Sequence, residues 1–150
     1  MEQIKNFAQI DERLGTGGQP TEAQLREVAE AGYEVVVNLG LLDPRYCLPD
    51  EAGLVESLGL KYHHIPVKFD APTVEDFQRF LVLMDRCPTR KTFIHCAANY
   101  RVSSFVALYG QLRLAWTVEQ ADAHARRFWG LDEVWLGFIE ACRKQLGLDG

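Results

Sequence analysis

The sequence predicts an α/β fold, with a central, mostly parallel sheet of about four or five strands flanked by helices in three layers. Short apolar runs rich in β-branched residues alternate with longer segments of helical periodicity, an order that favours parallel pairing through right-handed crossovers. In addition, the run 91–94 leads through a cysteine-containing turn into a helical pattern that begins at Val102. Ligands bind such sheets beyond the carboxyl ends of the strands, so we expect the functional site there.

Three helix starts share one capping pattern. In each, a threonine stands three residues before a side chain that can return a hydrogen bond to it: Thr21 with Gln24, Thr73 with Asp76 and Thr117 with Gln120. We expect the first helix to run to about Ala31 and to stop at Gly32. The Thr73 helix carries an apolar face at helical spacing, and a shorter helix is expected over roughly 50–58.

Strands are expected at 33–39, 60–67 and 91–95, because each run is rich in β-branched and aromatic residues. The last of them leads to the proposed site and is therefore expected to be central. Segment 13–18 is expected to supply an edge strand and a turn. Its glycines resemble a phosphate-binding loop only superficially, because no lysine follows and no strand clearly precedes them.

After the last strand the chain is expected to be helical. Segment 102–114 is apolar nearly all round, which predicts a helix buried within a layer. Segment 117–128 is amphipathic. The final helix carries an apolar stripe that we interpret as core, formed by Val134, Trp135, Phe138, Ile139, Cys142 and Leu146.

Composition limits the function classes. The 150 residues are expected to form a single domain, 1–150, and the 25% charged and 47% hydrophobic residues are typical of a globular protein. The net charge of −5 argues against nucleic acid or an anionic membrane surface as the main partner. No apolar stretch approaches a membrane span and no secretory signal opens the chain, so we expect a cytoplasmic protein. The four cysteines lack paired zinc-site spacing, and disulfides are not expected.

The most informative segment is the heptapeptide His95-Cys96-Ala97-Ala98-Asn99-Tyr100-Arg101. A turn from a strand into a helix gathers backbone N–H groups around a bound oxyanion, and the helix dipole adds roughly +0.5 charge there. The same field favours a thiolate at Cys96, and Arg101 is close enough in sequence to direct its guanidinium into the turn. The alternative for Cys96 is a small, inert, buried hydrophobic residue.

The pair His95-Cys96 after a strand, followed by Arg101, resembles the phosphate loop of cysteine-dependent protein-tyrosine and dual-specificity phosphatases. The upstream blocks 14–20, 35–39 and 65–67 resemble a small, mostly bacterial branch of that superfamily, related to beta-lactamase-hydrolase-like domains. The resemblance covers roughly residues 7 to 115. It implies a three-layer protein-tyrosine-phosphatase-like fold and a phosphoric monoester hydrolase that uses no cofactor.

The resemblance also implies residue roles. Cys96 would attack phosphorus to form a phosphocysteine, and Arg101 would bind the equatorial oxygens. Asp70 would protonate the leaving group and later activate water. The oxyanion cradle would be formed by the backbone amides of the loop and the first helical turn, namely those of Ala97, Ala98, Asn99, Tyr100 and Arg101.

Further roles remain open at this stage. Asp76 competes with Asp70 as the acid, although its place in a capping box already explains it. His95 would orient the loop and help to keep the thiolate ionised. Ser103 or Ser104 would replace the hydroxyl that the superfamily often places directly after the arginine, since this chain has Val102 there.

The loop departs from the usual phosphatase pattern in two ways. Four residues, instead of five, separate Cys96 from Arg101, and the usual glycine is absent. Asn99 is the loop residue best able to adopt a left-handed conformation. The shorter loop raises a rival function, because rhodanese-like sulfurtransferases hold a persulfide in a loop of this length. A non-catalytic phosphate-binding module, which would need Arg101 but not Cys96 or Asp70, is a third possibility.

The sequence says less about a metal site and about the identity of the substrate. His63 and His64 are adjacent on an expected strand and therefore point to opposite faces, so no metal site is predicted. The expected substrate is a phosphorylated protein or a small phosphorylated metabolite. Tyr100 within the loop and Arg45 near its rim are expected to shape the pocket. They do not distinguish phosphotyrosine from phosphoserine, phosphothreonine, an inositol phosphate or a nucleotide, and the oligomeric state is not predicted.

Overall fold

The centre of the structure, a computed structural model that describes residues 1–148, is a sheet of five strands in the order β1-β2-β5-β3-β4. Its strands are β1 (Ala8–Gln9), β2 (Leu14–Gly17), β3 (Val35–Asn38), β4 (Lys61–His64) and β5 (Thr92–His95). Only the β1–β2 pair is antiparallel. The expectation that the strand before Cys96 is central is confirmed. The expectation that segment 13–18 forms the edge is wrong, because β1 pairs along the free side of β2.

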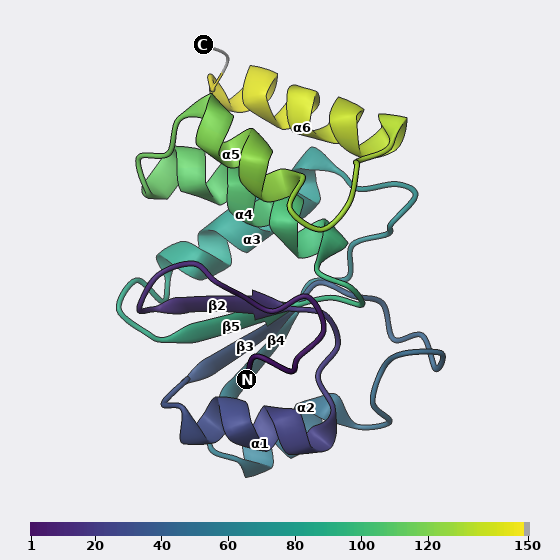
Figure 1. Cartoon of the computed structure of the whole chain (residues 1–150), viewed down its shortest axis with the longest axis vertical. Helices are drawn as coiled ribbons and strands as arrows, with labels where there is room; N and C mark the ends of the chain where they lie inside the picture. Colours follow the sequence, from purple (N-terminus) through teal and green to yellow (C-terminus); the bar gives the residue numbers. More distant parts are fainter. Residues whose placement is uncertain (149–150) are drawn as a thin grey trace.

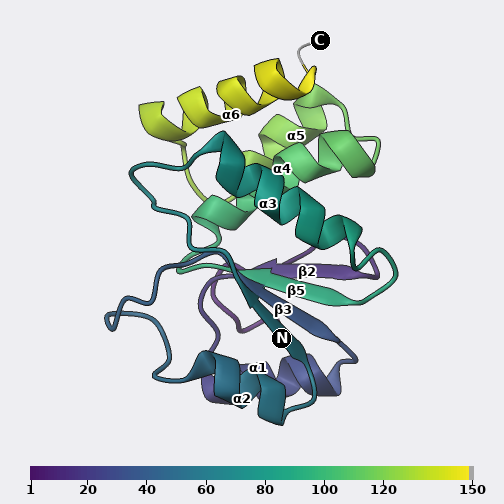
Figure 2. The same cartoon turned by 180° about the vertical axis from the view of Figure 1, so that it is seen from behind.

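The helices form two layers, one on each face of the sheet (Figures 1 and 2). One layer holds α1 (Glu22–Glu30) and α2 (Glu51–Ser57). The other holds α3 (Val74–Asp85), α4 (Tyr100–Arg113), α5 (Val118–Ala125) and α6 (Glu133–Leu146). The predicted three-layer α/β architecture is therefore confirmed.

Alternating side chains of each strand build two separate cores. In β5, Ile94 belongs to the larger core beneath α3–α6, together with Phe77 and Phe105. Its neighbour Phe93 belongs to the smaller core beneath α1 and α2. His95 shares that second face, with its ring 6.2 Å from the ring of Phe93. The last residue of the central strand therefore points away from the layer that contains α4.

Side-chain caps distinguish α4 from every other helix in residues 1–148. The three threonine capping boxes are present as predicted, and Asp50 and Asp132 cap α2 and α6. The N-cap of α4 is Asn99, which makes no side-chain cap hydrogen bond and lies in the left-handed region with φ 67°. The prediction for the backbone of Asn99 is confirmed, and the first N–H groups of α4 lack a side-chain cap.

Helix α4 is enclosed by its neighbours, as its sequence predicts. All ten residues from Arg101 to Gly110 are buried. The helix begins at Tyr100, two residues before the expected start, so Arg101 lies in its first turn. No helix within residues 1–148 combines the length and the apolar character needed to cross a membrane.

The apolar stripe of α6 differs from the prediction at one residue. Trp135, Phe138, Ile139 and Cys142 are buried and Leu146 packs against the core, but Val134 is 44% exposed. Val134 directly precedes Trp135, and one residue turns a helix by about 100°, which carries Val134 off the buried face.

Two helical glycines give matched tests of this packing. A Cβ added at Gly110 in α4 would overlap the indole ring of Trp116, whereas one added at Gly137 in α6 would meet nothing within 4 Å. We expect Gly110→Ala to lower the free energy of unfolding by roughly 1–3 kcal/mol through overpacking. Gly137→Ala should raise it by up to ~1 kcal/mol through helix propensity. Urea denaturation measures both, and a stabilising Gly110→Ala would contradict the packing described here.

Candidate active site

The loop between β5 and α4 lies at the carboxyl end of the central strand and forms one wall of a pocket. The pocket has a volume of about 220 Å³ and is lined by Phe69, Cys96, Ala97, Ala98, Tyr100 and Arg101. Five of the residues that the sequence predicted for the site are thus brought together. Cys96 is only 1% exposed, and it is one of the residues that line this pocket.

Neighbouring segments hold the carbonyl groups of the loop. The backbone N–H of Gln19 donates to Ala97 O at 2.9 Å, and the Asn6 side chain donates to Ala98 O at 2.8 Å. The C=O and N–H of one trans peptide unit point in opposite directions. The N–H of Ala98 therefore points away from Gln19, and the N–H of Asn99 points away from the Asn6 side chain.

Gly18 permits this close approach of the loop to the end of β2. A Cβ at Gly18 would lie 2.6 Å from Ala97 O, closer than real Cβ atoms approach backbone. The side chain of Asn99 anchors the same junction, since its amide donates to Asn6 O at 2.8 Å and to Thr16 Oγ1 at 3.1 Å. Asn99 therefore supports the loop from behind, and its side chain does not line the pocket.

Arg101 supplies a buried positive charge to the pocket wall. The residue is 5% exposed, and its Nη1 donates to Val67 O at 2.9 Å. Its Nη2 lies 3.5 Å from Tyr46 Oη, and its Cζ lies 5.9 Å from the centre of the Phe69 ring. Within residues 1–148 no carboxylate forms a salt bridge with Arg101. A buried cation without a carboxylate partner, next to the uncapped N-terminus of α4, is suited to bind an anion.

His95 is fully buried behind the loop and contacts it directly. Its Nε2 lies 2.6 Å from Glu51 Oε2, and its Nδ1 lies 3.3 Å from Cys96 O. Glu51, 4% exposed, also accepts a 2.6 Å hydrogen bond from the Gln19 side chain. Burial raises the pKa of the Glu51 carboxyl, but the hydrogen bonds from His95 and Gln19 and the charge on His95 outweigh burial, and the pKa lies below its ordinary value.

The sequence analysis did not identify Glu51 or Gln19 as partners of His95. Gln19 lies within the block 14–20 that carries the phosphatase resemblance, which was a usable signal. Glu51 resembles an ordinary acidic residue in the first turn of a helix. Only the three-dimensional structure brings it to His95, 44 residues away in sequence.

The two candidate acids differ in their surroundings. Asp76 is 8% exposed, completes the α3 capping box and forms a 3.0 Å ion pair with Arg79. Asp70 is exposed and lies in the turn that follows Phe69, a residue of the pocket wall. The carboxylate of Asp76 is therefore occupied by structural contacts, whereas Asp70 is next in sequence to the pocket.

Three side chains that the sequence analysis placed at or near the site lie elsewhere. The hydroxyl of Ser103 donates to Tyr100 O at 2.9 Å and lies 3.4 Å from Ala125 O, so it faces the packing between α4 and α5. The side chain of Arg45 is 87% exposed and pairs with Asp43. Neither residue lines the pocket, because the helical rotation of α4 and the course of the 41–49 loop carry them away from it. Ser104 is fully buried, and it does not line the pocket either.

Aromatic residues that the sequence analysis did not assign to the site support the pocket wall. The rings of Tyr100 and Trp129 are stacked, with centroids 4.8 Å apart and planes 3° from parallel. Phe69 lies 5.2 Å from Trp129, and the indole N–H of Trp135 donates to Phe69 O at 2.7 Å. The segment between α5 and α6 thus contributes to the site, although the sequence resemblance ends near residue 115.

The adjacent histidines of β4 form no metal cluster. His64 Nε2 lies 2.6 Å from Gly40 O, which occupies that ring nitrogen. In the part of the chain that the structure describes, no group of three or more His, Cys, Asp and Glu side chains is placed to hold a metal ion.

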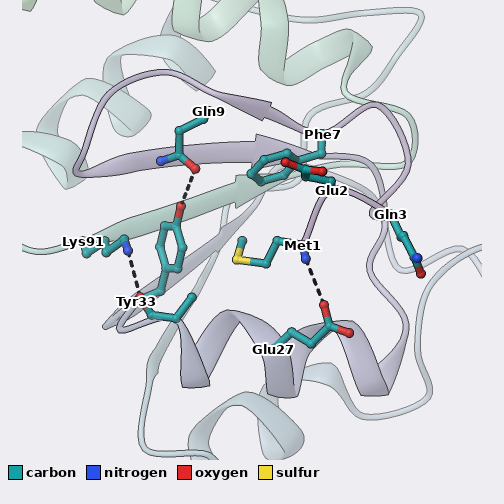
Figure 3. Close-up of a pocket in the computed structure, with 9 residues that line it drawn as sticks. Met1, Glu2, Gln3, Phe7, Gln9, Glu27, Tyr33 and Lys91 are labelled. Atoms are coloured by element: carbon teal, nitrogen blue, oxygen red, sulfur yellow. Dashed lines mark hydrogen bonds and ion pairs between the residues drawn. The ribbon is translucent and has the colours of Figure 1, made fainter.

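A larger pocket, of about 580 Å³, lies at the opposite end of the sheet (Figure 3). Lys91 directly precedes β5, and Tyr33 lies two residues before β3. Both line this pocket, together with residues of the N-terminal segment and Glu27 of α1. The Tyr33 hydroxyl donates to Gln9 Oε1 at 3.3 Å, and Lys91 Nζ donates to Ala31 O at 2.8 Å. None of the predicted site residues lines this pocket, and in parallel sheets ligands bind at the other end.

Solved structures of phosphatases share this architecture. A DUF442 protein from Shewanella putrefaciens CN-32, whose name assigns it to the phosphatases, is 29% identical over 96% of this chain and 95% of that chain, with a TM-score of 0.86. Tk-PTP in its active form is 22% identical over 93% and 97%, with a TM-score of 0.80. The core catalytic domain of the PP-IP phosphatase SIW14 from S. cerevisiae is 15% identical over 91% and 85%, with a TM-score of 0.76. No curated protein sequence gives a significant match.

A family model extends the likeness from fold to family. The model described as "DSP-PTPase phosphatase fused to NAD+ Kinase" matches residues 2–132. That match includes the Cys96 loop, Arg101, Asp70 and the upstream blocks, and it confirms the resemblance stated from the sequence. The chain therefore belongs to this family, within the superfamily of cysteine-dependent protein-tyrosine and dual-specificity phosphatases, and it is a phosphatase.

Proposed function

We propose that residues 1–150 act as one catalytic domain that hydrolyses phosphate monoesters through a phosphocysteine intermediate. The observation that carries this proposal is that Cys96 and Arg101 line one pocket at the N-terminus of α4, which has no side-chain cap. Arg101 is buried and forms no salt bridge with a carboxylate of residues 1–148. The substrate is a phosphorylated protein or a small phosphorylated metabolite. The shared pocket and the family membership favour this chemistry over sulfur transfer, and the position of Cys96 in the pocket wall favours catalysis over simple phosphate binding.

The reaction proceeds in two displacements. The Cys96 thiolate attacks phosphorus, the bond to the leaving oxygen breaks, and Asp70 gives that oxygen a proton. Asp70, now a carboxylate, takes a proton from water, whose oxygen attacks the phosphocysteine. The phosphorus–sulfur bond then breaks, which releases inorganic phosphate and restores the thiolate. In both steps Arg101 and the loop N–H groups bind the equatorial oxygens, where negative charge is concentrated.

Replacement of the nucleophile tests the mechanism most directly. We expect wild-type protein to hydrolyse p-nitrophenyl phosphate in the presence of a metal chelator. Cys96→Ser should lower kcat by roughly a thousandfold or more, because a serine hydroxyl is barely ionised at neutral pH. Cys87→Ser, at a partly buried cysteine outside the pocket, is the matched control and should retain activity. Full activity in Cys96→Ser would exclude the phosphocysteine, and sulfur transfer from thiosulfate to cyanide without phosphate release would support the sulfurtransferase.

The role of Asp70 is tested by varying the leaving group. Asp70→Asn should lower kcat for alkyl phosphates by about 10²–10⁴-fold, the usual contribution of a general acid. Its effect on the first step with p-nitrophenyl phosphate should be small, because that leaving group needs little protonation. Asp76→Asn, which removes the carboxylate charge that pairs with Arg79 in the first turn of α3, should instead lower thermal stability without this dependence on the leaving group. The opposite pattern in the two variants would assign the acid to Asp76.

A further inference from the structure

A closed chain of hydrogen bonds joins α2 to the Cys96 loop. Gln19 connects Ala97 O to Glu51 Oε1, through its backbone N–H at 2.9 Å and its side-chain amide at 2.6 Å. Glu51 Oε2 meets His95 Nε2 at 2.6 Å, and His95 Nδ1 meets Cys96 O at 3.3 Å. The chain closes because Cys96 and Ala97 are consecutive. Its two ionisable members, Glu51 and His95, are 4% and 0% exposed.

The partners of His95 determine its protonation state. One ring nitrogen faces a carboxylate oxygen and the other faces a backbone carbonyl oxygen, and both oxygens only accept hydrogen bonds. A neutral imidazole has a single N–H donor, so it would leave one of these buried contacts without a proton. Because the pKa of Glu51 lies below its ordinary value, its carboxyl is ionised and cannot donate, and only the imidazolium form of His95 satisfies both contacts. The ionised Glu51 carboxylate, which accepts from Gln19 through its other oxygen, neutralises that buried charge.

Two titratable side chains of β4 interact with Glu51. His64 of β4 lies close enough to Glu51 to favour its ionised form, and Glu51 in turn opposes ionisation of Tyr62 on the same strand. Burial raises the pKa of Tyr62 to about 12, so its hydroxyl remains neutral at physiological pH. On its own sheet face His95 lies beside the apolar ring of Phe93. Glu51 is thus the carboxylate that forms a hydrogen bond with His95.

The network acts on the peptide units of the predicted oxyanion cradle. Cys96 O and the Ala97 N–H belong to one peptide unit, and Ala97 O and the Ala98 N–H belong to the next. Hydrogen bonds to the two carbonyls fix the directions of the two N–H groups, because each peptide unit is planar. A donor on the carbonyl also polarises the unit and makes its N–H a stronger donor. His95 and Gln19 therefore act on consecutive units from behind the pocket.

We propose that Glu51 is a positioning residue that holds His95 as an imidazolium, so that a fixed positive charge and an oriented Ala97 N–H favour the thiolate of Cys96. This inference rests on the proposed function of Cys96 as a nucleophile. It assigns to the first residue of α2, on the opposite face of the sheet from α4, a part in activating the thiol (Figure 1). If the Glu51–His95 pair served only to attach α2 to the sheet, its loss would change stability but not the ionisation of Cys96.

The test follows alkylation of Cys96 by iodoacetamide against pH, with the modified peptide identified by mass spectrometry. Glu51→Gln keeps the size of the side chain and removes its charge. We expect its alkylation at pH 6 to be about tenfold slower than that of wild type, with an equal limiting rate at high pH, because the thiolate forms at higher pH. Glu56→Gln, at an exposed carboxylate on the same helix, is the control and should match wild type. A folded Glu51→Gln protein with the wild-type profile would overturn the proposal.

A second measurement needs no variant. Nitrogen NMR of uniformly labelled wild-type protein at pH 7 should show both ring nitrogens of His95 protonated, and a neutral tautomer would overturn the proposal even if Glu51→Gln fails to fold. Hydrolysis of p-nitrophenyl phosphate is measured on the same samples. An absence of hydrolysis in wild type, with the alkylation shift intact, would refute the phosphatase mechanism and leave the role of Glu51 standing.

Discussion

The buried guanidinium of Arg101 is the group on which the arrangement of the pocket depends. Its direct partners, Val67 O and the Tyr46 hydroxyl, come from two separate segments that follow β4 and β3, and neither carries a negative charge. A charge buried in this way is costly until an anion joins it. The start of α4 likewise has no side-chain acceptor for its first N–H groups. A dianionic phosphoryl group would satisfy all of these groups together, and the fold keeps them in place before it arrives.

The sheet explains how such groups meet. Gly17, Asn38 and His95 end their strands in register, so the segments that follow them emerge side by side. Gly18 lets the first of these segments approach the loop, and Asn99 turns the loop into α4 through its left-handed backbone. The side chains of His95 and Cys96 then belong to opposite faces of the sheet. His95 lies with the α1–α2 core, whereas Cys96 lies with the α3–α6 core.

Much of this organisation could be predicted from the sequence, because it depends on local patterns. The capping boxes, the central strand before Cys96 and the backbone of Asn99 each follow from a few neighbouring residues. The position of β1 could not be predicted, since two residues carry too little periodicity to identify a strand. The partnership of Glu51 with His95 and the stacking of Trp129 on Tyr100 were also missed. They join residues 44 and 29 positions apart, and neither side chain differs in type from an ordinary surface acid or core aromatic.

The stack of Trp129 on Tyr100 also places a fluorescent side chain next to the pocket wall. Two of the three tryptophans, Trp129 and Trp135, touch the aromatic wall around Phe69, whereas Trp116 packs on Gly110 at the far end of α4. An anion that draws Arg101 and the loop together would change the surroundings of an indole ring 4.8 Å from the tyrosine in that loop. The intrinsic fluorescence of the protein is therefore expected to report on the occupancy of the candidate pocket.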